Sequence, residues 1–269
     1  ESSESGIAQG DGLHTVTAVR SSVADPMGTI GGLGPLDRRP RDASGRAVTH
    51  DHDLGVLQQL ASRAVLLDIE RDGEPLYVLP PPMAGFFEFS MMRLRGDIDQ
   101  KVLGELFYQY MNIEEDFIRN LFVRGETQLG RVFVHEPVLS NDNALHVLDY
   151  ERASDVIQSA THRGIGVCYC RHKAEHVGKA CKAPMNICMT FGGTADSLIR
   201  HGFARRVDGA EGIDLLAEAH DNNLVQFGEN VQRDVAFICN CCGCCCEAMI
   251  AARRFAAARA QRPGQRRYS

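Results

Sequence analysis

Residues 235–246 read VAFICNCCGCCC, a short apolar run followed at once by six cysteines within eight residues. The apolar run over 235–238 predicts a buried strand that leads directly into the thiols. Thiolates are soft ligands, and such a density of them is typical of a site for a soft metal ion or cluster. The stretch therefore predicts a thiolate metal site that follows a buried strand.

A second group of cysteines lies upstream, in the phrase CYCRHKAEHVGKACKAPMNIC over residues 168–188. Four thiolates are a complete ligand set for one tetrahedral zinc ion or one 4Fe-4S cluster. The spacing matches neither the paired C-x2-C knuckles of zinc sites nor the C-x2-C-x2-C-x3-C-P run of bacterial ferredoxins, so both metals stay open. The ligands expected for the first site are Cys168, Cys170, Cys181 and Cys188.

The downstream run allows several arrangements of its thiols. Alternation along a strand would divide them into Cys239, Cys241 and Cys245 on one face and Cys242, Cys244 and Cys246 on the other. A turn at Gly243 would instead bring together residues four apart, Cys241 with Cys245 and Cys242 with Cys246. One cluster cannot use all six, so the alternatives are a second cluster held by a subset, two clusters shared between the groups, or a redox-active thiol pair.

Basic side chains surround the upstream group and would neutralise part of the thiolate charge, which lowers cysteine pKa values. Two of them, His172 and His176, are four residues apart and share one face if the segment is helical. Each could act as a ligand, a proton carrier or a hydrogen-bond donor. The full set is Arg171, His172, Lys173, His176, Lys179 and Lys182.

Composition limits the class of protein. The chain has 269 residues, 44% of them hydrophobic, and a net charge of −6, which argues against a nucleic-acid-binding surface over the whole molecule. No segment approaches the roughly eighteen uninterrupted apolar residues that a membrane span requires. Adjacent cysteines make poor disulfide partners, so free thiols and a cytoplasmic location are expected.

Changes in composition and pattern divide the chain into five parts and predict an α+β fold. A winged-helix-like N-terminal module consists of a helix, a strand, an Asp72-Gly73 turn and a second strand. A helical middle and a cysteine-rich, iron–sulfur C-terminal half follow. The expected parts are a flexible leader (1–46), the winged-helix-like module (47–92), a helical region (93–160), a metal-cluster domain (161–248) and an arginine-rich helix or tail (249–269).

Apolar residues recur every three or four positions from Ile98 to Phe122, which predicts a long amphipathic helix or a pair of helices broken near Asn112. Further helices are expected over 149–160, 195–206 and 212–224, and a short strand over 131–134. Pro184 and the pair Gly192-Gly193 suggest irregular backbone around the upstream cysteines.

Three phrases resemble those of bacterial and archaeal proteins described as 4Fe-4S ferredoxin-type iron–sulfur binding proteins: LPPPMAGFFEFSMMR (79–93), GVCYCRHK (166–173) and ICNCCGCCC (238–246). The resemblance covers about residues 50–255. It implies iron–sulfur binding and electron transfer, with ligands drawn from the cysteines of both groups. Many such proteins also carry a ferredoxin run with C-x2-C-x2-C-x3-C-P spacing, which these residues lack.

The leading hypothesis is therefore a protein with one or two 4Fe-4S clusters that exchanges electrons with a redox partner protein as part of an oxidoreductase system. One alternative is a redox- or metal-sensing regulator whose 51–82 module contacts DNA, although Arg63 and Arg71 are its only basic residues. A zinc-binding protein is another. No nucleotide fingerprint or catalytic triad order names a reaction.

Overall fold

The computed structural model describes residues 51–71, 73–80, 87–120, 122, 130–139 and 151–260. The predicted leader over 1–46 and the last residues of the arginine-rich tail lie outside these ranges. Within them, helices and strands are mixed, and every strand pair is antiparallel. This mixture of helices and antiparallel strands agrees with the predicted α+β class.

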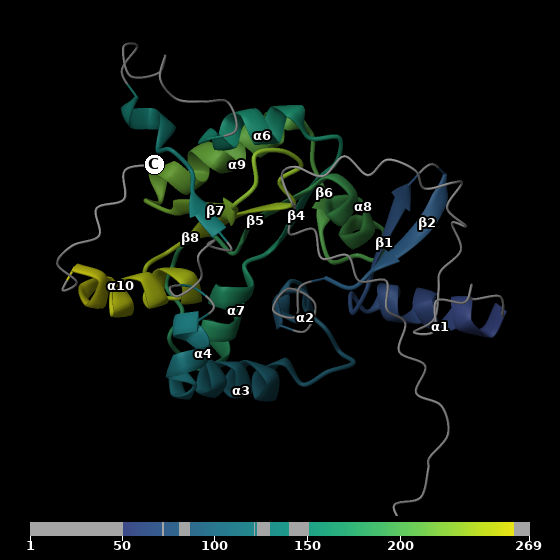
Figure 1. The fold of residues 1–269 in the computed structure, drawn as a ribbon, viewed down its shortest axis with the longest axis horizontal. Helices are drawn as coiled ribbons and strands as arrows, with labels where there is room; N and C mark the ends of the chain where they lie inside the picture. The colour runs from purple at the N-terminus through teal and green to yellow at the C-terminus, as the bar shows by residue number, and fades with distance from the viewer. Residues whose placement is uncertain are drawn as a thin grey trace, which may run out of the picture.

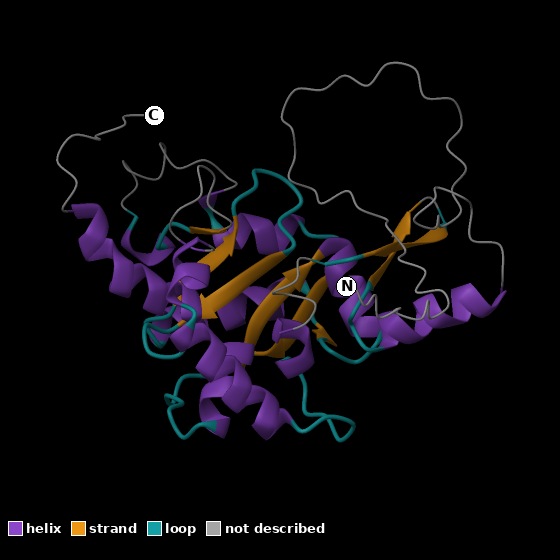
Figure 2. Ribbon diagram, turned by 60° about the horizontal axis from the view of Figure 1, so that its bottom comes forward, coloured by secondary structure: helices purple, strands orange, loops and turns teal. Residues whose placement is uncertain are grey.

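A six-stranded sheet forms the centre of the described chain, with its strands side by side and helices packed against it (Figure 2). Its central strands β5 and β8 pair with Met189 opposite Ile238. One position further along, Cys188 and Cys239 are therefore neighbours on adjacent strands. In spatial order the strands are β3 (Gly130–Val132), β7 (Val225–Glu229), β8 (Phe237–Cys241), β5 (Asn186–Phe191), β4 (Arg163–Val167) and β6 (Arg205–Arg206).

Helices cover both faces of this sheet, with α6 and α9 on one side and α3, α4 and α7 on the other (Figure 1). No described helix is long and apolar enough to cross a membrane. The α-helices are α1 (Asp51–Ser62), α2 (Phe89–Met91), α3 (Gln100–Ile113), α4 (Glu115–Arg119), α6 (Ala153–Ser159), α7 (Tyr169–His176), α8 (Gly192–Arg200), α9 (Gly209–Asp221) and α10 (Glu247–Ala260), and η3 (Glu136–Val138) is a 3-10 turn.

Two hydrophobic clusters lie against the sheet and differ in chemistry. The cluster under α6 and α9 is built from aliphatic and aromatic side chains such as Ile157, Leu216 and Ile238. The other cluster includes Ile187 and Leu198, but seven of its buried members are cysteines. The sheet therefore separates an ordinary apolar core from a core rich in thiols, and α7 covers the thiol side.

The helix predicted between Ile98 and Phe122 is a pair, as one of the two sequence alternatives expected. Asp99 caps α3, because its side chain accepts hydrogen bonds from the backbone N–H groups of Lys101 and Val102, both at 3.0 Å. The break falls at Glu114, two residues after the predicted position. Helices α6, α8, α9 and α10 also occur near their predicted positions.

The backbone around the upstream cysteines is more regular than the sequence suggested. Strand β4 and helix α7 carry the chain through Cys168 and Cys170, and Cys188 lies within β5. Irregular backbone is found at the positions that suggested it, in the loop that holds Cys181 and Pro184 and at Gly192, whose φ is +58°, but not at Cys168, Cys170 or Cys188. Cross-strand pairing of β5 with both β4 and β8 stabilises this segment, and such long-range pairing has no local sequence signal.

The N-terminal unit has the predicted order of helix, strand, turn and strand, with β1 (Leu67–Arg71) paired to β2 (Glu74–Val78). Asp68 attaches the hairpin to α8. Its carboxylate accepts hydrogen bonds from Ser197 Oγ at 2.6 Å, Arg200 Nη1 at 2.5 Å and His201 Nε2 at 3.0 Å. Burial raises the pKa of Asp68, but these hydrogen bonds, led by that of Arg200, outweigh burial and hold it below its ordinary value.

The Asp68→Asn variant should therefore be less stable by about 1–3 kcal/mol, because charge-assisted hydrogen bonds are lost at a partly buried site. A depressed folded-state pKa stabilises the protein above the ordinary value of 3.8 and loses that contribution as pH falls through the folded value. Thermal unfolding should show a lower midpoint for the variant at neutral pH, and a smaller difference from wild type in acid below about pH 4. Asp116→Asn is the control, since that carboxylate is 83% exposed; equal midpoints for the two variants would contradict this account.

Candidate metal centre

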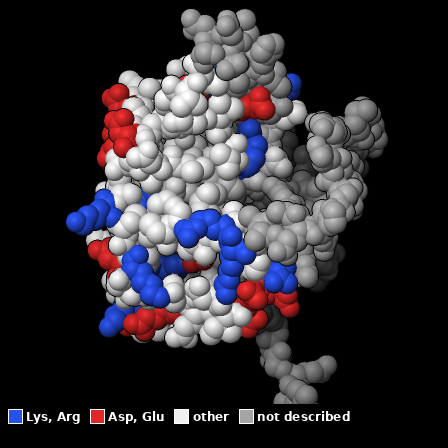
Figure 3. Space-filling model, turned by 90° about the vertical axis from the view of Figure 1, so that its left-hand side faces the viewer, with Lys and Arg blue, Asp and Glu red and all other residues white. Residues whose placement is uncertain are grey.

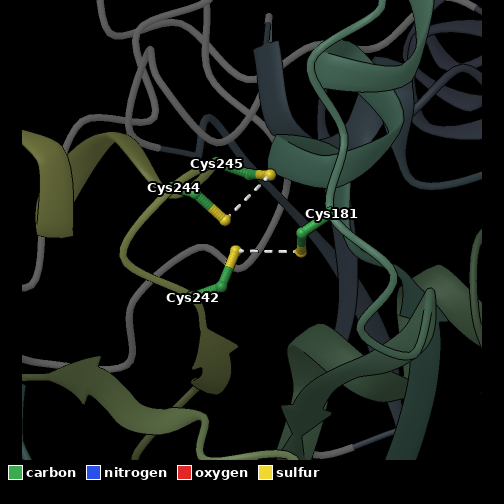
Figure 4. Close-up of side chains that lie close together, drawn as sticks. All are labelled: Cys181, Cys242, Cys244 and Cys245. Atoms are coloured by element: carbon green, nitrogen blue, oxygen red, sulfur yellow. Dashed lines mark hydrogen bonds between the residues drawn. The ribbon is translucent and has the colours of Figure 1, made fainter.

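The thiols of four cysteines lie close together in the structure: Cys181, Cys242, Cys244 and Cys245. Their sulfur atoms all lie within 4.8 Å of one another. The Sγ–Sγ distance is 3.6 Å between Cys181 and Cys242 and 3.7 Å between Cys244 and Cys245. Figure 4 shows the side chain of Cys181 directed toward the other three, which come from the loop between β8 and α10. We refer to these four thiols as the quartet.

Two turns bring the quartet together. Helix α7 ends at His176, and Gly178 just beyond its C-cap has a φ of +69°, the left-handed conformation that glycine adopts readily. The backbone N–H of Lys179 donates to the carbonyl of Ala174 and that of Gly178 to the carbonyl of Glu175, which closes the helix with a Schellman motif. The chain then reverses toward Cys181, which lies in the loop before β5.

On the other side, the chain leaves β8 after Cys241 and turns over residues 243–245. The Cys246 N–H donates to the carbonyl of Cys242 at 3.3 Å, which closes the turn. Of the two arrangements that the sequence left open, the structure has the turn at Gly243, but the thiols do not group as that alternative suggested. Cys242 and Cys245 join the quartet, whereas the sulfur of Cys246 lies 3.2 Å from that of Cys241.

The remaining six cysteines form a second group behind the quartet, which we call the buried row. Their thiols interact in sequence, Cys168 with Cys188, Cys188 with Cys239, Cys239 with Cys241, Cys241 with Cys246, and Cys246 with Cys170. Five are buried, and Cys239 is partly buried. All ten cysteines are free thiols.

This grouping corrects one feature of the sequence interpretation. Cys181 was expected to share a site with Cys168, Cys170 and Cys188, but its thiol belongs to the quartet. The physical reason is the length of α7, which separates Cys181 from the helix start, where Cys168 and Cys170 lie. Cys188 faces the neighbouring strand β8 and therefore meets Cys239 instead.

Hydrogen bonds divide the buried row into acidic and weakly acidic thiols. Cys246 lies just before the first turn of α10, and hydrogen bonds from Cys170 and Cys241, and from the backbone N–H groups of Ala248 and Met249, hold its pKa well below the ordinary value. Hydrogen bonds with Cys246 and burial raise the pKa of Cys170. Within the row, the pKa values of Cys239 and Cys246 are lowered, and those of the other four thiols are raised.

In the quartet, Cys181 is the most readily ionised thiol for which a shift is resolved. Burial raises its pKa, but a hydrogen bond from the backbone of Ala183 and interactions with Cys242, Cys244 and Cys245 lower it to about 7. Because the thiolate is the form that binds a metal, this position favours ligation near neutral pH. Cys244 is the exposed member of the set.

The guanidinium of Arg171 lies between the two thiol groups and is fully buried. It donates to the carbonyl of Pro184 at 2.5 Å and to the carbonyl of Asn240 at 2.7 Å. Burial disfavours its charge, but the thiols of Cys168, Cys242 and Cys188 outweigh burial and raise its pKa. Its Nε–H is buried and has no hydrogen-bond partner among the described residues, which is rare for a buried donor.

The sequence predicted that basic residues would surround the thiols, and α7 buries three of them in succession. Lys173 forms an ion pair with Glu247, and both side chains are at most 5% exposed. His172 donates from Nδ1 to the carbonyl of Met91 at 2.8 Å, and its Nε2 lies 3.2 Å from Nε2 of His176. The two histidines share a helix face as predicted, but neither belongs to the thiol quartet.

Two acidic residues beside the buried row were not predicted from the sequence. Glu247 follows the cysteine run directly and pairs with Lys173. Glu88 interacts with Tyr169 and Cys246, and burial raises the pKa of its carboxyl to about 7 despite the opposing hydrogen bond from Tyr169. Only the position of Glu247 next to a metal-binding run was available as a sequence signal; the approach of Glu88 depends on tertiary packing.

Removing one member of the Lys173–Glu247 pair should be costly, because it leaves a buried charge unpaired. Burial already lowers the pKa of Lys173, while the thiols of Cys170 and Cys246 oppose that shift. We expect Glu247→Gln to reduce the free energy of unfolding by about 3–5 kcal/mol in urea denaturation. The exposed pair of Arg205 and Glu211 supplies the control variant Glu211→Gln, with a loss of about 1 kcal/mol or less.

The double variant Lys173→Met with Glu247→Leu removes both charges and should recover most of the lost stability. Equal, small effects of Glu247→Gln and Glu211→Gln would show that the buried pair contributes no more than a surface pair.

Comparisons of the chain with protein-family models, with curated proteins and with solved structures gave no match. The case for a function therefore depends on the thiols themselves. The geometry supports the statement that the quartet, Cys181, Cys242, Cys244 and Cys245, could bind a metal.

Proposed function

We propose that this chain is an iron–sulfur protein that transfers electrons, with the quartet as the ligands of a 4Fe-4S cluster near the surface. The observation that carries the proposal is the convergence of four thiols from two separate loops on one point, with Cys244 exposed. A 4Fe-4S cluster requires four cysteine ligands and supplies reversible one-electron transfer. The resemblance of three sequence phrases to those of iron–sulfur proteins is in line with the same assignment.

Features of the surrounding residues fit such a group. Hydrogen bonds to cluster sulfur tune the potential of iron–sulfur centres, and the buried Nε–H of Arg171 has no partner among the described residues. The positive charge of Arg171 offsets negative charge on the thiolates of either group. Three of the four quartet residues lie in a single turn between β8 and α10, so the thiols can spread around a larger core by movement of one loop.

The buried row supports a second cluster held by a subset of its thiols. Cys241 belongs to the row and Cys242 to the quartet, so the backbone passes from one group to the other between adjacent residues. Lys173 interacts with Cys170 and Cys246 of the row and with Cys245 of the quartet, and supplies a further positive charge. Two thiol groups this close would place one centre inside the protein and one at its surface.

Zinc binding is the second candidate, and the compactness of the quartet favours it. A tetrahedral ion with metal–sulfur bonds of about 2.3 Å holds its sulfur atoms about 3.8 Å apart. The two distances of 3.6 Å and 3.7 Å are close to that value. In this alternative the quartet is a structural or sensing site, and no electron transfer takes place there.

We also propose that α1, β1 and β2 form a winged-helix-like module with a packing role. Its Asp68 is engaged with α8, and its sequence has few basic residues, so contact with protein is favoured over contact with DNA. Ten free thiols suit a reducing compartment, and we propose the cytoplasm. A redox partner protein completes the electron-transfer role.

The experiment that tests this function is analysis of iron, acid-labile sulfide and zinc in protein purified without oxygen. We expect about four or eight iron atoms per chain with matching sulfide, and absorption near 400 nm that falls on reduction. Zinc in place of iron and sulfide would reject the iron–sulfur proposal in favour of the second candidate.

Serine variants in each thiol group assign the centres. Cys181→Ser should lower the iron content by about four atoms per chain, because a quartet ligand is lost. Cys188→Ser is the matched control in the buried row, and it should leave the quartet's share of iron in place. Unchanged iron in Cys181→Ser would rule out the quartet as the cluster site.

A further inference from the structure

A surface hollow of about 410 Å³ opens beside the quartet, at the exposed thiol of Cys244. It lies between the end of α3, the turn after β8 and the outer face of α10. Its lining combines the candidate metal ligand Cys244 with two arginines. The lining residues are Asn112, Gly243, Cys244, Ile250, Arg253 and Arg254. The quartet therefore reaches solvent at a cationic site.

The two arginines of this hollow have unequal partners. Arg254 Nε lies 3.3 Å from a carboxylate oxygen of Glu115, at an exposed position. Arg253 Nη1 donates to the carbonyl of Gly243 at 2.8 Å, and Arg253 has no carboxylate partner among the described residues. The hydrogen bond to Gly243 holds the positively charged guanidinium against the turn that carries Cys244.

Several Lys and Arg side chains lie in the middle of this face of the molecule, with Asp and Glu side chains around them (Figure 3). The chain as a whole has a net charge of −6, so a cationic area is a local exception to its overall charge. An acidic protein would be repelled by much of the surface and attracted here. Such a contrast both speeds encounter and fixes the orientation of a partner.

We propose that this hollow docks a carboxylate-bearing surface of an acidic redox partner, with Arg253 and Arg254 as its anion-binding residues. The proposal depends on the proposed function for the role of the contact, because it names the partner class that exchanges electrons through the quartet. Docking at this point brings the partner onto Cys244, the exposed quartet thiol. The hollow opens to the surface, as a site for a protein's side chains requires.

The first test compares alkylation of Cys244 by iodoacetate and by iodoacetamide. In both reactions the thiolate attacks the CH2 carbon and displaces iodide, so the ratio of the two rates cancels the thiolate fraction and reports only on attraction of the anion. The rates are measured at low ionic strength by mass spectrometry, and Cys244→Ser identifies the signal. We expect Arg253→Gln with Arg254→Gln to lower the ratio by about three- to tenfold.

The matched control replaces two adjacent exposed arginines on β6, Arg205→Gln with Arg206→Gln, which are 58% and 53% exposed. That variant has the same change in net charge but should keep the wild-type ratio. Equal ratios in all three proteins, or equal decreases in both double variants, would overturn the proposed anion-binding role of Arg253 and Arg254.

A second test separates an acidic protein from a small anion. Poly-L-glutamate should slow iodoacetamide labelling of Cys244 in wild type and in the β6 control, and salt should abolish the effect. It should not protect the Arg253→Gln, Arg254→Gln protein. Citrate at the same carboxylate concentration should protect much less; equal protection by citrate, or none by poly-L-glutamate, would reject the docking of an acidic protein.

Failure of this inference can be distinguished from failure of the proposed function. The alkylation ratios can be interpreted without knowing which metal is bound, provided that all variants are compared at equal metal content. Zinc without sulfide, together with a charge-sensitive ratio at Cys244, would leave the anion site standing and remove only its link to electron transfer. Iron and sulfide, together with a ratio that the Arg253 and Arg254 substitutions do not change, would support the proposed function and reject the anion site.

Discussion

The buried guanidinium of Arg171 is the interaction on which the thiol-rich half of the fold depends. It joins three separate segments, because it extends from α7 and donates to Pro184 in the loop after Cys181 and to Asn240 on β8. Asn240 in turn donates to Ile187 of β5 and accepts from Gln226 of β7, so the cation is connected to three neighbouring strands. A buried cation is unfavourable unless it is paired and hydrogen-bonded. Here two backbone carbonyls accept its hydrogen bonds and the thiols of Cys168, Cys242 and Cys188 interact with it, which means that the fold of this half and the arrangement of its cysteines depend on each other.

This dependence explains why the buried charged residues Arg171, Lys173 and Glu247 lie on the thiol side of the sheet. Lys173 and Glu247 neutralise each other, and Lys173 also interacts with thiols of both groups. Glu88 lies against Cys246 with a pKa of about 7, so it can take up or release a proton near neutral pH when the charge of the row changes. Binding of a metal requires loss of thiol protons. The thiol core therefore contains its own counter-charges and proton-exchanging groups, as a site that changes charge would need.

The sequence predicted the chemistry of this region better than its geometry. Cysteine density, the basic residues around it and the strand before it were all readable, because each is a local property. The helix pair broken near Asn112 followed from apolar periodicity in the same way. The partners of Cys181 were not readable, since they depend on the length of α7 and on the turn at Gly178. Strands β4 and β5 were missed because their stability comes from pairing across the sheet, and Glu88 because only tertiary packing brings it to Cys246.

The two thiol groups differ in their access to solvent. Charge added to the buried row has little access to water, so Arg171, Lys173 and Glu88 must compensate it within the protein. Charge added to the quartet reaches solvent at Cys244 and lies beside Arg253, which has no carboxylate partner among the described residues. Arg171 interacts with Cys168 and Cys188 of the row and with Cys242 of the quartet, so a change of charge in one group alters the potential at the other. The arrangement therefore links an internal thiol group to an external one, and the external group reaches solvent through Cys244.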